Sequence, residues 1–166
     1  FTLVLLVNLI PSSFWAGYCI FFSALIVTIR TDLEQMLISR YVTLMLIPFG
    51  WILSAINWLP LTLYESVLGS LIGYTILYVI AVTFKAITGK DGMGQGDLEL
   101  LAFIGAFTGP LGCLVTLTIA STAGALFGLI YGLISSKKAI IVPFGPFLSG
   151  GAMIYSLFEY QLFSLF

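Results

Sequence analysis

The sequence predicts an all-α fold, a polytopic integral membrane helical bundle with about six spans. Of its 166 residues, 60% are apolar and only 8% are charged, whereas roughly 25% of the residues in a soluble globular domain are charged. The apolar residues also occur in long runs that approach the ~20 residues a helix needs to cross a bilayer. A soluble fold of this length would need many more polar side chains to cover its surface.

Polar segments, glycines and prolines divide the chain into apolar stretches that we expect to be helical. They are residues 12–29, 41–58, 61–84, 98–108, 111–134 and 139–158. Pro48 is expected to break the second stretch, because proline removes a backbone donor from a helix. The fourth stretch is short, so we expect it to be tilted or to continue the segment before it. Residues 1–10 are too short to span a bilayer and can form a partial N-terminal helix.

The basic residues predict the orientation of this bundle. All of them lie in alternate loops between the expected spans: Arg30 and Arg40, Lys85 and Lys90, Lys137 and Lys138. Alternate loops share one membrane face, and an excess of Lys and Arg marks the cytoplasmic face. Trp15, Trp58 and Tyr64 then fall near the opposite interface, where aromatic side chains are enriched.

The composition argues against several classes of function. Six Lys and Arg against seven Asp and Glu leave no basic surface for nucleic acid. The chain has no histidine, and Cys19 and Cys113 both lie inside apolar runs, so neither a zinc site nor a His-dependent triad is expected. We therefore expect no metal, no cofactor and no nucleic-acid partner, and a lipid bilayer around the helices.

The acidic residues carry more information about function. Asp32, Glu34, Asp91, Asp97 and Glu99 all belong to the first two cytoplasmic loops. Ionisable groups at a membrane edge are functional candidates. A simpler role also fits each of the two most prominent ones: Asp32 could form an ion pair with a neighbouring base, and Asp97 could cap a helix that begins at residue 98. The two remaining acids, at positions 65 and 159, lie near the other ends of spans and can be solvated there.

Glycines precede Asp97 at alternate positions, in the run Gly92-Met93-Gly94-Gln95-Gly96-Asp97. Glycine is costly inside a helix, so we expect this segment to be unwound or bent. Without side chains the segment lets another backbone approach closely, and a carboxylate follows at once. This pattern suits an enzyme that holds an extended peptide against an acid.

Three stretches resemble a known family. FKAITGKDGMGQGDLELLAFIGAF (84–107) is similar to the signature of the type IV prepilin peptidases, which carry a Gly-x-Gly-Asp motif. TDLEQMLISRYVT (31–43) resembles the Asp-containing loop of that family, and VPFGPFLSGGA (142–152) resembles its Pro-Phe-Gly-Pro-Phe segment. The resemblance runs from about residue 20 to the end. Ser39 and Arg40 stand where the family usually has Pro and Asp, and Glu99 stands where it often has Lys.

The resemblance implies an intramembrane aspartic endopeptidase with Asp32 and Asp97 as its catalytic pair. The substrate-binding residues would be Gly94, Gly96, Phe144, Gly145 and Pro146. It also implies a multi-pass protein of the bacterial inner membrane with its active site facing the cytoplasm. The implied substrates are type IV prepilins or type II secretion pseudopilins, precursors with a short basic leader ahead of an apolar helix.

The resemblance also bears on the domain organisation. We expect residues 1–166 to form a single transmembrane peptidase domain. The N-terminal cytoplasmic cysteine-rich region of the family is not among these residues, so we expect no methyltransferase activity from this chain alone.

Other functions fit part of the pattern. A transporter or channel could use intramembrane carboxylates for protons or cations, but it would not explain why both motif aspartates lie at one face. A presenilin-like protease shares the Gly-x-Gly-Asp element, but the loop around Asp32 and the 142–152 segment favour the prepilin peptidases. An inactive membrane anchor would not need glycines before an acid.

Overall fold

The computed structural model describes residues 14–35, 40–90, 92–134 and 143–163. Apart from Phe14, which has 3₁₀-helical geometry, every regular element within these ranges is an α-helix. The helices are α2 (Trp15–Gln35), α3 (Arg40–Ala55), α4 (Leu63–Thr88), α5 (Gln95–Ile134) and α6 (Gly145–Phe163). The prediction of an all-helical protein is therefore confirmed for the described part of the chain.

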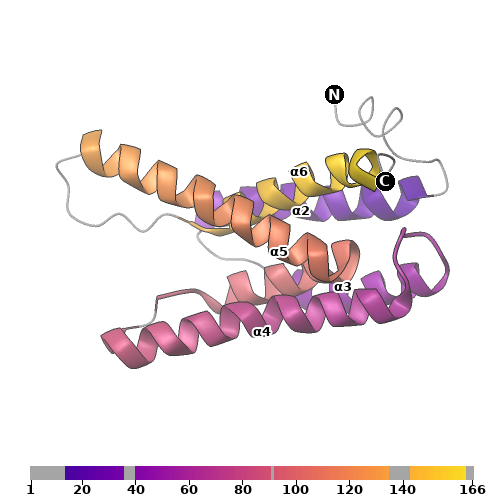
Figure 1. The fold of residues 1–166 in the computed structure, drawn as a ribbon, viewed down its shortest axis with the longest axis horizontal. Coiled ribbons are helices and arrows are strands. Elements are labelled where there is room, and N and C mark those ends of the chain that lie inside the picture. Colours follow the sequence, from indigo (N-terminus) through magenta and orange to yellow (C-terminus); the bar gives the residue numbers. More distant parts are fainter. Residues whose placement is uncertain (1–13, 36–39, 91, 135–142, 164–166) are drawn as a thin grey trace.

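Helix α5 runs through the middle of the bundle. Figure 1 shows α2 and α6 side by side on one side of it, and α3 and α4 together on the other. Both α4 and α6 pack along α5, which therefore connects the two pairs. The last turns of α5 project beyond the other helices (Figure 1), and their apolar side chains are highly exposed, Leu133 at 88% and Ile134 at 79%.

Helix α5 is folded back on itself at Gly109. This residue has φ 71° and ψ −175°, outside the helical region, and Pro110 follows it. Glycine adopts a positive φ without the steric cost that a side chain would impose. Two helical arms result, 95–108 and 110–134, and the Cys113 Sγ of the second arm donates to the Leu101 carbonyl of the first at 3.5 Å. Every residue from 98 to 109 is buried, so the first arm is the centre of the core.

Glycines bring α4 against both arms of α5. A β-carbon at Gly69 would overlap the Gly105 carbonyl oxygen, and one at Gly73 would lie 2.5 Å from the Leu101 carbonyl oxygen. Small residues at a membrane helix interface allow this kind of close backbone packing. A hydrogen bond from Ser66 Oγ to the Ala106 carbonyl, at 2.5 Å, joins the same two helices.

Helix α2 packs against the first arm of α5 through aromatic side chains. The Phe21 ring stacks on Phe107 with centroids 5.1 Å apart and lies 5.5 Å from Phe103. All three side chains are fully buried. Aromatic pairs at these separations contribute about 0.5–1.5 kcal/mol each beyond the burial of their surface.

A buried carboxylate connects α2 and α6 at one end of the bundle. Glu159 on α6 is 8% exposed, and it accepts hydrogen bonds from the Tyr18 hydroxyl of α2 and the Tyr155 hydroxyl of α6, each at 3.2 Å. The expectation that Glu159 is solvated is therefore wrong, because two phenols enclose it. For Glu65, in contrast, the expectation of a solvated side chain is confirmed. Glu65 is exposed and forms a capping box with Thr62 at the start of α4.

Three of the described helices are long and apolar enough to cross a membrane. They are Trp15–Glu34, Leu63–Thr88 and Gln95–Ile134. The expected number of about six spans remains a prediction. Pro48 does not break its helix as expected: α3 continues through it, since membrane helices can satisfy the freed backbone groups locally.

We predict that Tyr18→Phe and Tyr155→Phe each lower the free energy of unfolding by about 1–2 kcal/mol, because each removes a donor from the buried Glu159 carboxylate. Thermal unfolding of the purified protein in detergent should show a lower Tm for both variants. Tyr78→Phe is the matched control, because Tyr78 is 51% exposed on α4. Equal Tm values for all three variants would contradict the role of this contact.

Candidate active site

Asp32 lies in the last turn of α2, directly opposite the start of α6. Its side chain is 6% exposed, and its carboxylate accepts a hydrogen bond from the backbone amide of Gly145. The first amides of a helix have no acceptor within the helix, and the positive end of the helix dipole attracts anions. Gly145 is the first residue of α6, so its amide is available to the carboxylate.

The sequence of the 142–152 segment explains this helix start. The Phe144 carbonyl accepts hydrogen bonds from the amides of Phe147 and Leu148, both at 3.1 Å, so the first helical turn begins directly after it. Pro146 has no amide to donate and is tolerated in the first turn, where amides lack helical acceptors anyway. Pro146 therefore does not disrupt α6, because it lies in the first turn of the helix.

Asp97 is the third residue of α5. Its amide donates to the Gly94 carbonyl at 3.2 Å, and its carboxylate accepts in return from the Gly94 amide. An acid at this position commonly reaches back to the residue that caps its helix. The helix thus begins at Gln95 and Gly94 occupies the cap, so the alternative that Asp97 caps a helix starting at residue 98 is wrong.

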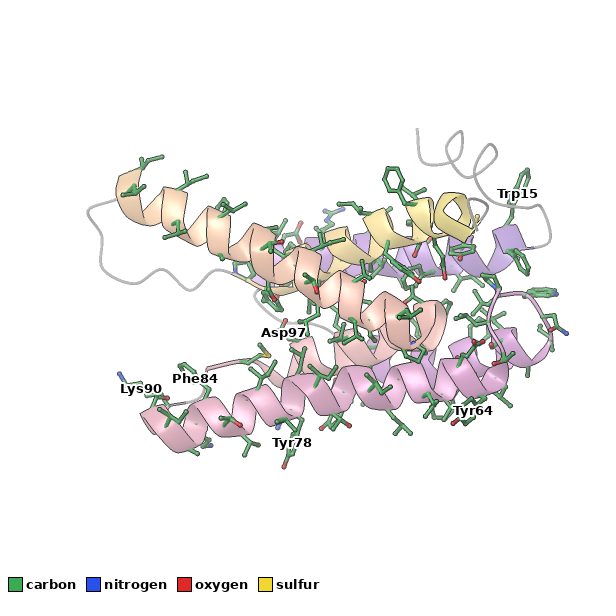
Figure 2. All side chains as sticks on the ribbon, in the orientation of Figure 1. Trp15, Tyr64, Tyr78, Phe84, Lys90 and Asp97 are labelled. Atoms are coloured by element: carbon green, nitrogen blue, oxygen red, sulfur yellow. The ribbon has the colours of Figure 1, made fainter. Side chains whose placement is uncertain are left out.

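The two aspartates face one site. The charge of Asp32 acts directly on the Asp97 carboxylate, although 65 positions separate them in the sequence. Asp97 is partly exposed, whereas Oδ2 of Asp32 is buried and has no hydrogen-bond partner among the described residues. Figure 2 shows Asp97 inside the bundle, closer to the end that carries Lys90 than to the end with Trp15. The bundle therefore brings a carboxylate at the end of α2 and one at the start of α5 close enough to interact electrostatically.

The five residues expected to bind substrate lie around this pair. Gly94 and Gly145 are the closest, since their amides contact the two carboxylates. Gly96 and Pro146 lie in the first turns of α5 and α6 and are partly exposed. Phe144 lines a neighbouring cavity. Their role in binding remains a prediction.

The other acids of the two loops take different positions. Glu34 is exposed and forms an ion pair with Arg30, which lies one helical turn before it. The distance from Arg30 Nε to Glu34 Oε1 is 2.9 Å. Glu99 is 4% exposed on the first arm of α5. Asp91, and the family departures Ser39 and Arg40, lie at positions whose side chains are outside the described part. Of the five acids in the first two loops, Asp32 and Glu99 are therefore buried in the bundle and do not lie at its surface.

An apolar cavity of about 340 Å³ next to the aspartates was not expected from the sequence. Residues from α4, the loop before α5, the second arm of α5 and the start of α6 line it. Because four separate segments contribute, no local pattern could have indicated it. Within the described ranges, no cluster of three or more His, Cys, Asp or Glu side chains could hold a metal ion.

Comparison with known proteins identifies the family of this chain. Residues 19–129 match the type IV leader peptidase family. The chain belongs to this family. The match includes both Asp32 and Asp97 but ends before the start of α6. No solved structure matches the chain at a significant level.

Several curated relatives are named prepilin leader peptidase/N-methyltransferase. One from Aeromonas salmonicida (strain A449) is 37% identical over 122 residues, 71% of this chain and 40% of the relative. One from Xanthomonas campestris is 36% identical over 138 residues, 81% of this chain and 48% of the relative. One from Dichelobacter nodosus is 36% identical over 151 residues, 90% of this chain and 51% of the relative. The chain thus spans between two fifths and one half of the length of these relatives.

We predict that the contact between the end of α2 and the start of α6 can be trapped by a disulfide. In a background lacking Cys19 and Cys113, the pair Asp32→Cys with Gly145→Cys should crosslink on mild oxidation, because the side chain at position 32 reaches the backbone at position 145. Mass spectrometry of the digested protein detects the linked peptides.

The control for this experiment pairs Asp32→Cys with Gly150→Cys. A β-carbon at Gly150 has no neighbour within 4 Å, so this pair should stay reduced. Equal crosslinking of both pairs would contradict the described contact.

Proposed function

We propose that this chain carries the active site of an intramembrane aspartic endopeptidase. The enzyme removes the leader peptide from type IV prepilins or type II secretion pseudopilins at the cytoplasmic face of the bacterial inner membrane. The meeting of the Asp32 and Asp97 carboxylates at one site is the observation that carries this proposal. Family membership and the names of the curated relatives support the substrate class.

The chemistry requires two carboxylates that share one proton. Two carboxylates about 3 Å apart cannot both remain ionised. The ionised aspartate takes a proton from a water molecule as the water attacks the scissile carbonyl carbon, and the protonated aspartate donates to the carbonyl oxygen. When the tetrahedral intermediate collapses, the C–N bond breaks and the new amine leaves with a proton from the pair. The products are the leader with a free carboxylate and the shortened pilin.

The helix starts hold the pair ready for this reaction. The amides of Gly145 and Gly94 each fix one carboxylate, and fixed hydrogen-bond donors reduce the reorganisation that a reaction requires. Glycine at positions 94, 96 and 145 leaves the backbone open to an extended peptide. In this proposal Phe144 and Pro146 complete the wall of the substrate site.

A basic leader would lie in solution next to the acids of the cytoplasmic face. Glu34 remains at the surface, with its carboxylate 56% exposed beside Arg30. Asp32 and Glu99 are buried, so they make no direct surface contacts with a leader. Electrostatic attraction of this kind raises the rate of association and falls with salt.

The alternative of a transporter or channel has less support. Such a protein needs polar groups along a path across the membrane. Here Asp32 and Asp97 interact with each other, and Glu159 is enclosed by two tyrosines elsewhere on α6. Between these groups, α2 and the first arm of α5 contribute the fully buried rings of Phe21, Phe103 and Phe107.

We predict that neither Asp32 nor Asp97 can be replaced without loss of cleavage. Asp→Asn at either position preserves size but removes the ionisable group, so the rate of prepilin cleavage should fall on the order of 10³-fold or more. The double variant should be hardly worse than either single one, because the two groups act as a unit. Leader removal is measured on gels with purified protein and a candidate prepilin.

Glu34→Gln serves as the control for these variants, since Glu34 is an exposed member of an ion pair on the same helix as Asp32. It should retain most of the activity. All variants must accumulate in the membrane like the parent protein. Near-normal cleavage by Asp32→Asn or Asp97→Asn would overturn the proposal.

The proposed orientation gives a separate prediction. In a background lacking Cys19 and Cys113, Lys90→Cys should resist a membrane-impermeant thiol reagent in intact spheroplasts and react in inverted vesicles. Tyr64→Cys should behave in the opposite way. Both positions are exposed, and Figure 2 shows them at opposite ends of α4. Labelling of Lys90→Cys from outside would reverse the topology.

A further inference from the structure

Helices α2 and α6 face each other along one buried seam. Asp32 lies opposite Gly145 at one end, and a second contact joins the helices 14 residues earlier on α2 and 14 residues later on α6. These equal intervals mean that the helices run antiparallel, so the position four residues inward pairs Thr28 with Ser149. Both side chains are buried, Thr28 at 5% and Ser149 at 0% exposure. Thr28 and Ser149 are therefore the first pair of the seam behind the Asp32 carboxylate.

Two oxygen atoms in this part of the seam are buried and have no hydrogen-bond partner among the described residues. They are Oδ2 of Asp32 and Oγ of Ser149. A serine or threonine within a helix can donate to the carbonyl four residues before it, and Thr28 does so, to the Ala24 carbonyl at 2.8 Å. Within the described part of the chain, Ser149 makes no such bond. Buried polar groups are costly to leave unpaired, so both oxygens need a partner.

The geometry of the two helices directs these side chains toward each other. Every Cα–Cβ bond of a helix tilts toward the N-terminus of that helix. Asp32 on α2 therefore leans toward the level of Ser149, and Ser149 on the antiparallel α6 leans toward the level of Asp32. Gly145 adds no side chain between them. The two oxygens do not bond each other directly, and a polar contact over a longer distance commonly runs through water.

We propose that Asp32, Ser149 and Thr28 together bind one buried water molecule, and that Ser149 thereby acts as a positioning residue for the Asp32 carboxylate. The water accepts a hydrogen bond from the Ser149 hydroxyl and donates to Asp32 Oδ2 and to Thr28 Oγ1, since a hydroxyl that donates can still accept. About three hydrogen bonds are typical of a buried water. The inference rests on the proposed peptidase function, and it places Ser149 behind the aspartate rather than in contact with the substrate.

Such a water supports the catalytic carboxylate from the side away from the substrate. The Gly145 amide already holds the carboxylate at the start of α6. With a second bond at Oδ2, the carboxylate cannot rotate without losing one of the two. A water molecule can both donate and accept, so the support persists when the shared proton moves between Asp32 and Asp97. Catalytic groups held in this way need less adjustment during the reaction.

The test measures prepilin cleavage by Ser149→Ala with purified protein in liposomes. The kcat should fall about 10-fold or more, because a small misplacement of a catalytic group is costly. The KM should stay at the parental value, because Ser149 is fully buried.

Ser156→Ala is the matched control. Ser156 lies about two turns further along the same face of α6, is 1% exposed, and its hydroxyl also has no partner among the described residues. Each variant removes one buried hydroxyl from α6, so a general effect on the fold is common to both. Ser156→Ala should keep the parental kcat, and an equal kcat for the two variants would overturn the inference.

The shared water is tested by a second substitution. Thr28→Val removes a hydroxyl at nearly constant volume and should also lower kcat. If one water connects both hydroxyls to Asp32, the double variant Ser149→Ala/Thr28→Val should lose much less kcat than the product of the two single losses, because either change already releases the water. Single losses that multiply would show two independent effects and would contradict a shared water.

The outcomes separate this inference from the proposed function. If the Asp→Asn variants are inactive while Ser149→Ala cleaves like Ser156→Ala, only the role of Ser149 fails. If the parent protein cleaves no prepilin, or the Asp→Asn variants cleave normally, the peptidase proposal fails and the positioning role falls with it.

Discussion

The close approach of α4 to the first arm of α5 sets the position of Asp97. At Gly69, Gly73 and Gly105 the two backbones touch directly, so no side chain can adjust the distance between the helices. Interiors packed in this way transmit displacement instead of absorbing it. Asp97 lies eight residues before Gly105, about 12 Å along the helix. A helix fixed at Gly105 therefore presents its first turn at a defined depth and angle.

Asp32 is positioned by a different device. Helices α2 and α6 meet at two points, Tyr18 with Glu159 and Asp32 with Gly145. Both intervals are 14 residues, about 21 Å of helix, so the two contacts can form together only when the helices are antiparallel and in this register. The contacts of Glu159 and Asp32 therefore fix the two ends of the same α2–α6 helix pair. The phenylalanine cluster around Phe21 packs this pair against α5.

Much of this structure could be predicted from local patterns. Apolar runs indicated the helices, and the glycine-rich run before Asp97 indicated an irregular segment at the start of α5. The rarity of charged groups singled out the five acids of the first two loops, and the family resemblance selected Asp32 and Asp97 among them. The burial of Glu159 could not be predicted, since its partner Tyr18 is 141 positions away. The central place of residues 98–108 was equally hidden, because a helix surrounded by protein and one surrounded by lipid have the same apolar composition.

The turn at Gly109 changes how crossings of the membrane must be counted. The first arm of α5 has 14 residues, about 21 Å, which is shorter than the ~30 Å hydrocarbon layer. The second arm runs back beside it, so the chain leaves α5 on the side where it entered. If α5 were counted as one crossing, every segment after it would be assigned to the wrong face. When α5 is counted as a hairpin, the segments before and after it are assigned to the same side of the membrane.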